Sequence, residues 1–139
     1  MEKIIAYTKG EARGNPGPAG IGVSLVTPLK EVVREVGQSI GNASSNFAEY
    51  QAVVVALHTL KKIYGPKTKT MHFELKLDNA PIKRQINHED QIKEPGLMPL
   101  FMEIHNLKVA SFPQLTITLI TPDENSDAHR LVAALLPLK

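Results

Sequence analysis

The sequence predicts one α/β domain in which helices pack against a single mixed β-sheet. Its 139 residues are the length of one ordinary domain with its own core, so residues 1–139 are treated as a single unit. Apolar residues make up 42% of the chain and charged residues 22%, which is typical of a globular protein. The strand and helix patterns follow the order βββαβααβα, which favours one sheet covered by helices.

The first third of the chain has the pattern of three strands joined by short turns. The predicted strands cover residues 3–8, 20–26 and 31–40. Turn-forming residues separate them, namely Gly14-Asn15-Pro16-Gly17-Pro18 and Thr27-Pro28-Leu29-Lys30. Because both links are short, the three strands are expected to be antiparallel neighbours.

A helical pattern follows a polar break at residues 42–45. A broad apolar face predicts a largely buried helix over residues 46–64, and Gly65-Pro66 predicts its end. Apolar and polar residues then alternate over residues 71–77, as in a strand. The remaining predicted elements are a helix at 80–86, a helix at 99–109, a strand at 115–121 and a helix at 125–136.

Composition and charge restrict the classes of function. Sixteen basic and fourteen acidic residues give a net charge of only +2, so any nucleic-acid binding is expected to be local and salt-sensitive. No apolar run approaches the roughly 20 residues that cross a bilayer, and the N-terminal residues lack the order of a signal peptide. The absence of cysteine excludes disulfides and thiolate metal sites and fits a reducing compartment, so we expect a cytoplasmic protein.

Three motifs occur in order along these elements. The first is the turn at residues 14–18, the second is Asn46-Phe47-Ala48-Glu49-Tyr50 at the start of the long helix, and the third is Asn125-Ser126-Asp127-Ala128-His129. Together they resemble the type 1 ribonuclease H family, whose members hydrolyse the RNA strand of RNA/DNA hybrids. The resemblance covers nearly the whole chain. It implies a ribonuclease H-like fold, in which a five-stranded mixed sheet carries helices on both faces.

The chemistry of that family depends on four carboxylates that hold two divalent cations about 4 Å apart. The resemblance assigns Lys9, Glu49, Asp78 and His129 to the four positions, so only Glu49 and Asp78 keep a carboxylate. An ammonium at Lys9 repels cations and has no lone pair to offer. A neutral imidazole at His129 can bind transition metals, so this change weakens a metal site without necessarily abolishing it.

Charge therefore argues against the usual reaction. With Lys9 protonated and His129 neutral, the four side chains sum to about −1, where four carboxylates would give about −4. The family implies magnesium or manganese, but we expect no bound cofactor here. Glu49 and Asp78 are the only expected ligands if any metal binds. We expect the Lys9 ammonium to pair with both carboxylates instead.

Each of these residues also has a purely structural interpretation. Lys9 could be an exposed lysine at a strand end, and His129 an exposed histidine on a helix. Glu49 could form a capping box with Asn46 as the N-cap, and Asp78 could cap the short helix that follows it. The sequence leaves these roles open beside the active-site ones.

The resemblance also implies a nucleic-acid surface. In the family, the residues matching Asn15, Ser44, Ser45 and Asn46 follow the minor groove and read RNA through its 2′-hydroxyls. Pro122 replaces an arginine that is usual before the last motif, and residues 86–97 resemble members that lack a basic protrusion. The basic residues at 61, 62, 67 and 69 are interpreted as a solvated helix end and loop. Binding is therefore expected to be weak.

The leading hypothesis is a catalytically degenerate member that binds an RNA/DNA hybrid or a structured nucleic acid. One alternative is an active but atypical ribonuclease that uses a single metal, with manganese favoured by His129. A second alternative is a protein-interaction scaffold built on the same fold. Cleavage of a hybrid in magnesium and in manganese separates the first two hypotheses.

Overall fold

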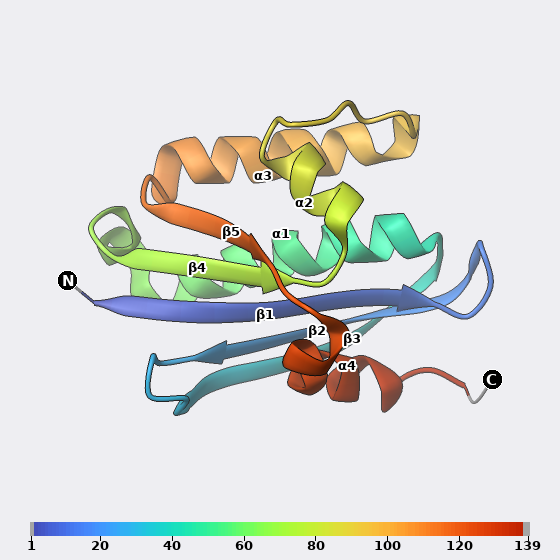
Figure 1. The fold of residues 1–139 in the computed structure, drawn as a ribbon, viewed down its shortest axis with the longest axis horizontal. Helices are drawn as coiled ribbons and strands as arrows, with labels where there is room; N and C mark the ends of the chain where they lie inside the picture. The colour runs from blue at the N-terminus through green and yellow to red at the C-terminus, as the bar shows by residue number, and fades with distance from the viewer. Residues whose placement is uncertain (1, 138–139) are drawn as a thin grey trace.

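The computed structural model describes residues 2–137, whose five strands form one sheet in the order β3-β2-β1-β4-β5 (Figure 1). The strands are β1 (Lys3–Ala12), β2 (Gly17–Val26), β3 (Val32–Ala43), β4 (His72–Leu77) and β5 (Leu115–Leu119). The helices are α1 (Ser45–Tyr64), α2 (Ala80–Ile86), α3 (Met98–Ser111) and α4 (Ser126–Ala133). Three short 3₁₀ helices join them, η1 (Gly65–Lys69), η2 (Pro95–Leu97) and η3 (Pro122–Asn125). The predicted order of strands and helices is confirmed.

Strand β1 lies at the centre of the sheet and determines where the site forms. On one side, β1 pairs with β2 and β2 with β3, and both pairs are antiparallel. On the other side, β1 pairs with β4 and β4 with β5, and both pairs are parallel. Tyr7 lies opposite Lys76 in the β1–β4 register. Because the two strands are parallel, the same register continued by two residues places Lys9, within β1, beside Asp78, which directly follows β4.

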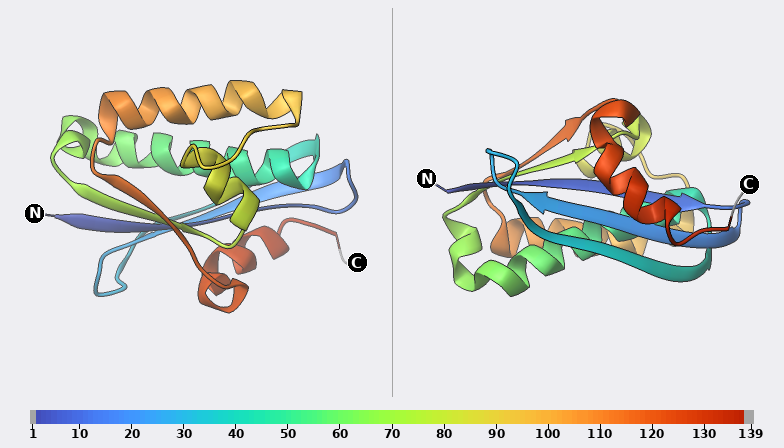
Figure 2. Two further views of the ribbon diagram at one scale, coloured as in Figure 1. Left: turned by 45° about the horizontal axis from the view of Figure 1, so that its top comes forward. Right: turned by 90° about the horizontal axis from the view of Figure 1, so that it is seen from below.

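Helices cover both faces of the sheet, as expected. Helices α1 and α3 lie over one face and α4 lies over the other (Figure 2). Two glycines allow the helices to approach the strands closely. A Cβ at Gly10 would lie 2.1 Å from the backbone of Ala48 in α1, and one at Gly22 would lie 2.4 Å from the carbonyl oxygen of Ala128 in α4. Larger residues at either position would push the helix away from the sheet.

The core lies mainly between the sheet and α1. Apolar side chains from alternate positions of β2, such as Ile21 and Val23, pack with buried residues of α1, such as Tyr50 and Leu57. This burial drives the folding of the sheet and holds the start of α1 beside β1. Within residues 2–137, no helix combines the length and apolar character needed to cross a membrane.

The structure excludes both helix caps that the sequence left open as alternative roles for Glu49 and Asp78. Ser44 is the N-cap of α1, because its Oγ accepts a hydrogen bond from the Phe47 amide at 3.1 Å. Asn46 therefore lies inside the first turn and forms no capping box with Glu49. Asn79 caps α2, since its Oδ1 accepts from the Ile82 amide at 3.2 Å, which excludes Asp78 from that role.

Several boundaries also differ from the predicted ones by a few residues, among them those of β1 and α4. Strand β1 continues to Ala12, beyond the predicted end at residue 8, because β2 pairs with it as far as Ala12. Helix α4 ends at Ala133, three residues before the predicted end.

Candidate functional site

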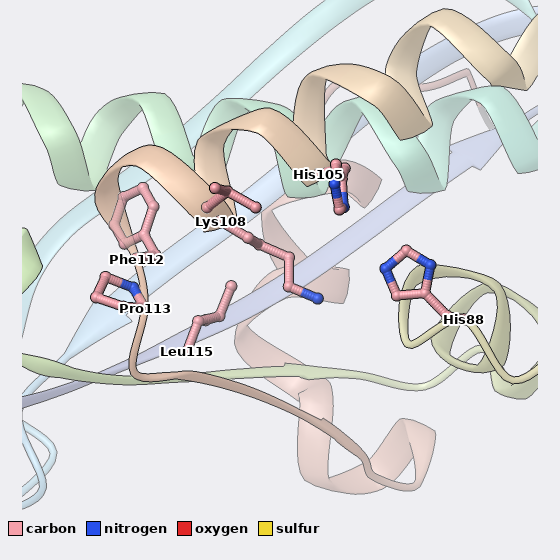
Figure 3. Close-up of a pocket in the computed structure, with 7 residues that line it drawn as sticks. His88, His105, Lys108, Phe112, Pro113 and Leu115 are labelled. Carbon is pink, nitrogen blue, oxygen red and sulfur yellow. The ribbon is translucent and has the colours of Figure 1, made fainter.

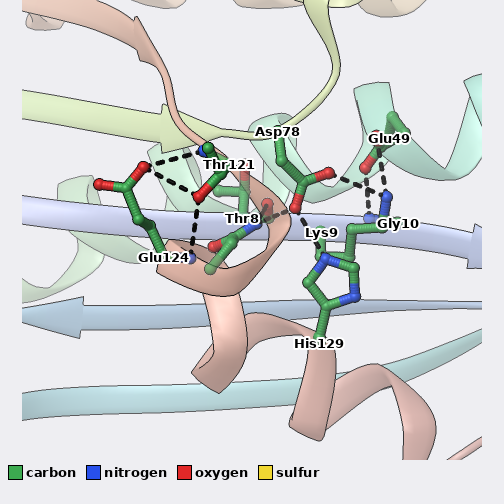
Figure 4. Close-up of polar contacts among 9 residues, drawn as sticks. Thr8, Lys9, Gly10, Glu49, Asp78, Thr121, Glu124 and His129 are labelled. Carbon is green, nitrogen blue, oxygen red and sulfur yellow. Dashed lines mark hydrogen bonds and ion pairs between the residues drawn. The ribbon is translucent and has the colours of Figure 1, made fainter.

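Four side chains from separate elements meet at the edge of the sheet near the end of β4. They are Lys9 from β1, Glu49 from α1, Asp78 directly after β4 and His129 from α4, and we call them the charge cluster (Figure 4). The Lys9 Nζ lies 3.4 Å from Glu49 Oε2 and 3.2 Å from Asp78 Oδ1. Only 16% of the Lys9 side chain is exposed, so Lys9 is not an ordinary exposed strand-end lysine. The expected pairing of Lys9 with both carboxylates is present.

Glu49 is the most deeply constrained member of the charge cluster. Its side chain is 4% exposed, and its Oε1 accepts a hydrogen bond from the Gly10 amide at 2.7 Å. Burial raises the pKa of Glu49 above its ordinary value, while the Lys9 charge and the Gly10 amide act in the opposite direction. Lys9 and the Gly10 amide therefore favour the ionised form of this buried carboxyl group, against the larger effect of burial.

Asp78 joins the cluster to the C-terminal part of the fold. Its Oδ2 accepts from Asn125 Nδ2 at 2.9 Å and lies 2.7 Å from His129 Nε2. Burial alone would raise the pKa of Asp78. The hydrogen bonds from Asn125 and His129 and the Lys9 charge outweigh this effect and lower the pKa. Asp78 is thus a carboxylate at neutral pH, and an ionised carboxylate can only accept, so His129 donates through Nε2.

His129 is accordingly no isolated surface residue, although 33% of its side chain is exposed. Its ring holds α4 against the loop after β4 through Asp78. The histidine therefore acts as a hydrogen-bond donor where the family resemblance implies a carboxylate acceptor.

Asn125 lies beside the charge cluster and has no role predicted from the sequence. Its Nδ2 donates to the Thr8 carbonyl at 2.9 Å as well as to Asp78, and the residue is fully buried. Its Oδ1 is buried without a hydrogen-bond partner in the described part of the chain. The motif at residues 125–129 could have indicated a role for this residue, since the motif begins with Asn125.

The donor set does not fit a pair of divalent cations. The ammonium of Lys9 already lies between the Glu49 and Asp78 carboxylates, the position from which one cation would have to contact both. Magnesium needs oxygen ligands at about 2.0–2.1 Å in octahedral geometry, and Lys9 and His129 supply no oxygen. Across residues 2–137, no three His, Asp or Glu side chains are grouped so that they could hold a metal ion.

The four residues expected to contact nucleic acid lie on two segments. Asn15 is exposed in the β1–β2 turn, while Ser44, Ser45 and Asn46 form the start of α1. A carboxylate already contacts two of them. Glu94 accepts from Ser44 Oγ at 3.3 Å and from Asn46 Nδ2 at 3.4 Å. This contact was not predictable from local sequence, because Glu94 is about fifty residues further along the chain.

The basic residues at 61, 62, 67 and 69 lie at the other end of α1 and in η1. All four are exposed, as the sequence predicts for a solvated helix end and loop.

Comparisons with known proteins agree on one family. A family model described as reverse transcriptase-like matches residues 7–134. The chain is 31% identical to ribonuclease HI of Halobacterium salinarum over 129 aligned residues. The aligned region covers 93% of this chain and 62% of that protein. The chain is 28% identical over 130 residues to the bifunctional protein Rv2228c of Mycobacterium tuberculosis, of which it spans 34%. The chain therefore corresponds to only part of these curated relatives.

Solved structures show the same similarity over the whole fold. LC11-RNase H1, isolated from compost by a metagenomic approach, has a TM-score of 0.92 and 38% identity, over 97% of this chain and 96% of that one. The structure of LC11-RNase H1 in complex with an RNA/DNA hybrid has a TM-score of 0.90, 37% identity and 94% coverage of both chains. RNase H1 of Halobacterium salinarum has a TM-score of 0.85 and 30% identity, with 96% of each chain covered.

Proposed function

Because this chain belongs to the type 1 ribonuclease H family, we propose that it is a hybrid-binding member that has lost the family's two-metal hydrolysis. The observation that carries the proposal is the position of Lys9, whose ammonium lies within 3.4 Å of the two remaining carboxylates. The ammonium offers no lone pair and repels divalent cations. The chain's own lysine thus offsets part of the negative charge that would otherwise attract metal.

The proposed ligand is an RNA/DNA hybrid, bound weakly. The complex of LC11-RNase H1 with such a hybrid supports this choice. Asn15 and the start of α1 are the proposed contacts, since both present polar groups that can reach phosphates and 2′-hydroxyls. A net charge of +2 implies few phosphate contacts and hence modest affinity at physiological salt.

A cleavage assay tests the catalytic part of the proposal. The protein is incubated with a labelled RNA/DNA hybrid in magnesium and in manganese, beside Glu49→Ala, Lys9→Asp and the double variant Lys9→Asp/His129→Asp. We expect the unmodified protein to cleave no faster than Glu49→Ala. The double variant, which has four carboxylates, is expected to gain metal-dependent cleavage and to be stabilised by the metal. Lys3→Asp, a charge reversal on the same strand outside the cluster, is the control.

Two other outcomes point to the alternative functions. Manganese-dependent cleavage by the unmodified protein that is lost in Glu49→Ala supports an atypical single-metal ribonuclease. A protein that dimerises with rising concentration, and binds no hybrid at low salt, supports a protein-interaction scaffold.

Fluorescence anisotropy with a hybrid and with duplex DNA at two salt concentrations measures the binding itself. We expect the hybrid to bind more tightly than the DNA, and its affinity to fall as salt rises. The proposed location is the cytoplasm, in keeping with the absence of cysteine.

A further inference from the structure

A hollow with both basic and apolar lining residues lies away from the charge cluster, between the C-terminal half of α3, the start of β5 and the segment after α2 (Figure 3). Its volume is about 290 Å³, just below the range of roughly 300–1,000 Å³ that is typical of small-molecule sites. The hollow is lined by His88, His105, Lys108, Val109, Phe112, Pro113 and Leu115. None of the four cluster residues contributes to it.

Lys108 is the charged residue of this hollow, and no carboxylate neutralises it. The side chain is half-buried, and within residues 2–137 no Asp or Glu oxygen lies within 4 Å of its Nζ. Burial lowers the pKa of Lys108, as expected for an ammonium that loses water without gaining an anion. An anion in the hollow would offset this loss of hydration.

The acidic residues nearest in the chain have other partners. Glu89 lies 3.1 Å from Lys83, and Glu103 lies 2.6 Å from His58. Asp90 lies 3.8 Å from an arginine of α2 and borders a different hollow. The hollow therefore presents basic groups without a local acid to balance them.

Two histidines complete the polar side of the hollow. The ring centroids of His88 and His105 are 5.4 Å apart and their planes are perpendicular. Phe101 fixes both rings, since it packs edge-on against His88 and stacks on His105. His88 has φ 61°, a left-handed conformation that favours few residues other than glycine, asparagine and histidine. Figure 3 shows the Lys108 ammonium and a ring nitrogen of His88 directed toward the same space.

We propose that this hollow binds the phosphate group of a small-molecule phosphate monoester. The proposed donors are the Lys108 ammonium and one ring N–H of each histidine, and three donors on separate side chains suit a tetrahedral dianion better than a planar carboxylate. Phe112, Pro113 and Leu115 form an apolar wall beside these donors, where the organic part of the ester packs. The proposal does not depend on the proposed hybrid binding.

A titration followed by NMR tests the site. Inorganic phosphate, phenyl phosphate and phenol are each added to the full chain at fixed pH and ionic strength, while the imidazole carbon–proton signals are recorded. We expect saturable shifts of His88 and His105 with both phosphates, and none of His58 or His72. Phenyl phosphate should bind more tightly than inorganic phosphate because its ring contacts the apolar wall, and phenol should give no shift.

Variants identify the donors. Lys108→Met keeps the aliphatic stem and should weaken phosphate binding about tenfold or more, since it removes a charge-assisted hydrogen bond. Lys61→Met, at the exposed end of α1, should bind as the unmodified protein does. His105→Asn provides a second test if Lys108→Met is poorly folded, and it should also weaken binding. Three outcomes would overturn the proposal: shifts that do not saturate, shifts that chloride reproduces equally, and shifts that persist unchanged in Lys108→Met.

Discussion

Replacing Lys9 with methionine should destabilise the protein by about 3 kcal/mol, because two buried carboxylates then lose their cation. At an effective dielectric constant of about 20, each contact at 3.2 or 3.4 Å represents roughly 5 kcal/mol of attraction before the cost of desolvation. Breaking a buried pair typically costs about 3–5 kcal/mol net. The lower end applies, since Asp78 keeps Asn125 and His129 as donors and Glu49 keeps the Gly10 amide.

The destabilisation should also depend on pH. The pKa of Asp78 is lowered in the folded protein, so its ionisation adds stability above the pH at which an unfolded aspartate titrates, about 4. That contribution is lost as pH falls toward the folded pKa. Without Lys9 both carboxyl groups become easier to protonate, and protonation relieves their unpaired charge. The deficit of Lys9→Met should therefore be largest at neutral pH and should narrow as pH approaches 4.

Urea unfolding followed by circular dichroism at pH 7 and pH 4.5 measures both effects. A loss of about 3 kcal/mol corresponds to a fall in Tm of roughly 10 °C for a domain of this size. Lys3→Met is the matched control, since Lys3 lies on the same strand but pairs with Glu74 while 43% exposed, and it should cost less than about 1 kcal/mol. A loss below about 1 kcal/mol for Lys9→Met at pH 7, or an equal loss at both pH values, would refute the reasoning.

Two further predictions concern Glu94 and Tyr50. If the start of α1 binds the hybrid, Glu94→Gln should tighten hybrid binding roughly two- to fivefold at low salt, because it removes the negative charge beside Ser44 and Asn46. The control Glu89→Gln should leave the affinity unchanged. Equal affinities of Glu94→Gln and the unmodified protein, measured by anisotropy, would count against this prediction. Burial raises the pKa of Tyr50 to about 12, so its neutral phenol supports the fold below about pH 10, and that support is lost as pH rises to about 12. An ultraviolet titration should show the ionisation of Tyr50 at this high pH, and the step should be absent in Tyr50→Phe. The same variant loses the 2.6 Å hydrogen bond to Gln85, which should cost about 1 kcal/mol of stability.

Periodicity and turn chemistry were sufficient to predict the order of elements. The alternation at residues 71–77 led to β4, and Gly65-Pro66 marked the end of α1. The motifs also predicted that Lys9, Glu49 and Asp78 lie together, and they do so because β1 and β4 are parallel neighbours and the start of α1 packs against β1. These features depend on local sequence and on a family pattern that covers the chain.

The helix caps were not predicted correctly because neighbouring side chains were equally able to cap the same helix. Ser44 and Asn46 are both good caps, and only the backbone path decides that Ser44 is used. Asn79 similarly caps α2 because Asp78 is held by Lys9 and His129. Contacts such as that of Asn125 with Thr8, which are 117 residues apart in sequence, have no local signature.

The position of α4 has a consequence for folding during synthesis. One face of the sheet is covered by α1, which directly follows the first three strands, whereas the opposite face at Gly22 is covered by α4. A ribosome produces the chain from its N-terminus, so this second face stays open to water until residues 126–133 have emerged. Asn125 and His129 arrive with the same segment and complete the hydrogen bonds of Asp78. A nascent chain arrested before residue 125 should therefore carry an uncovered sheet and an incompletely bonded Asp78.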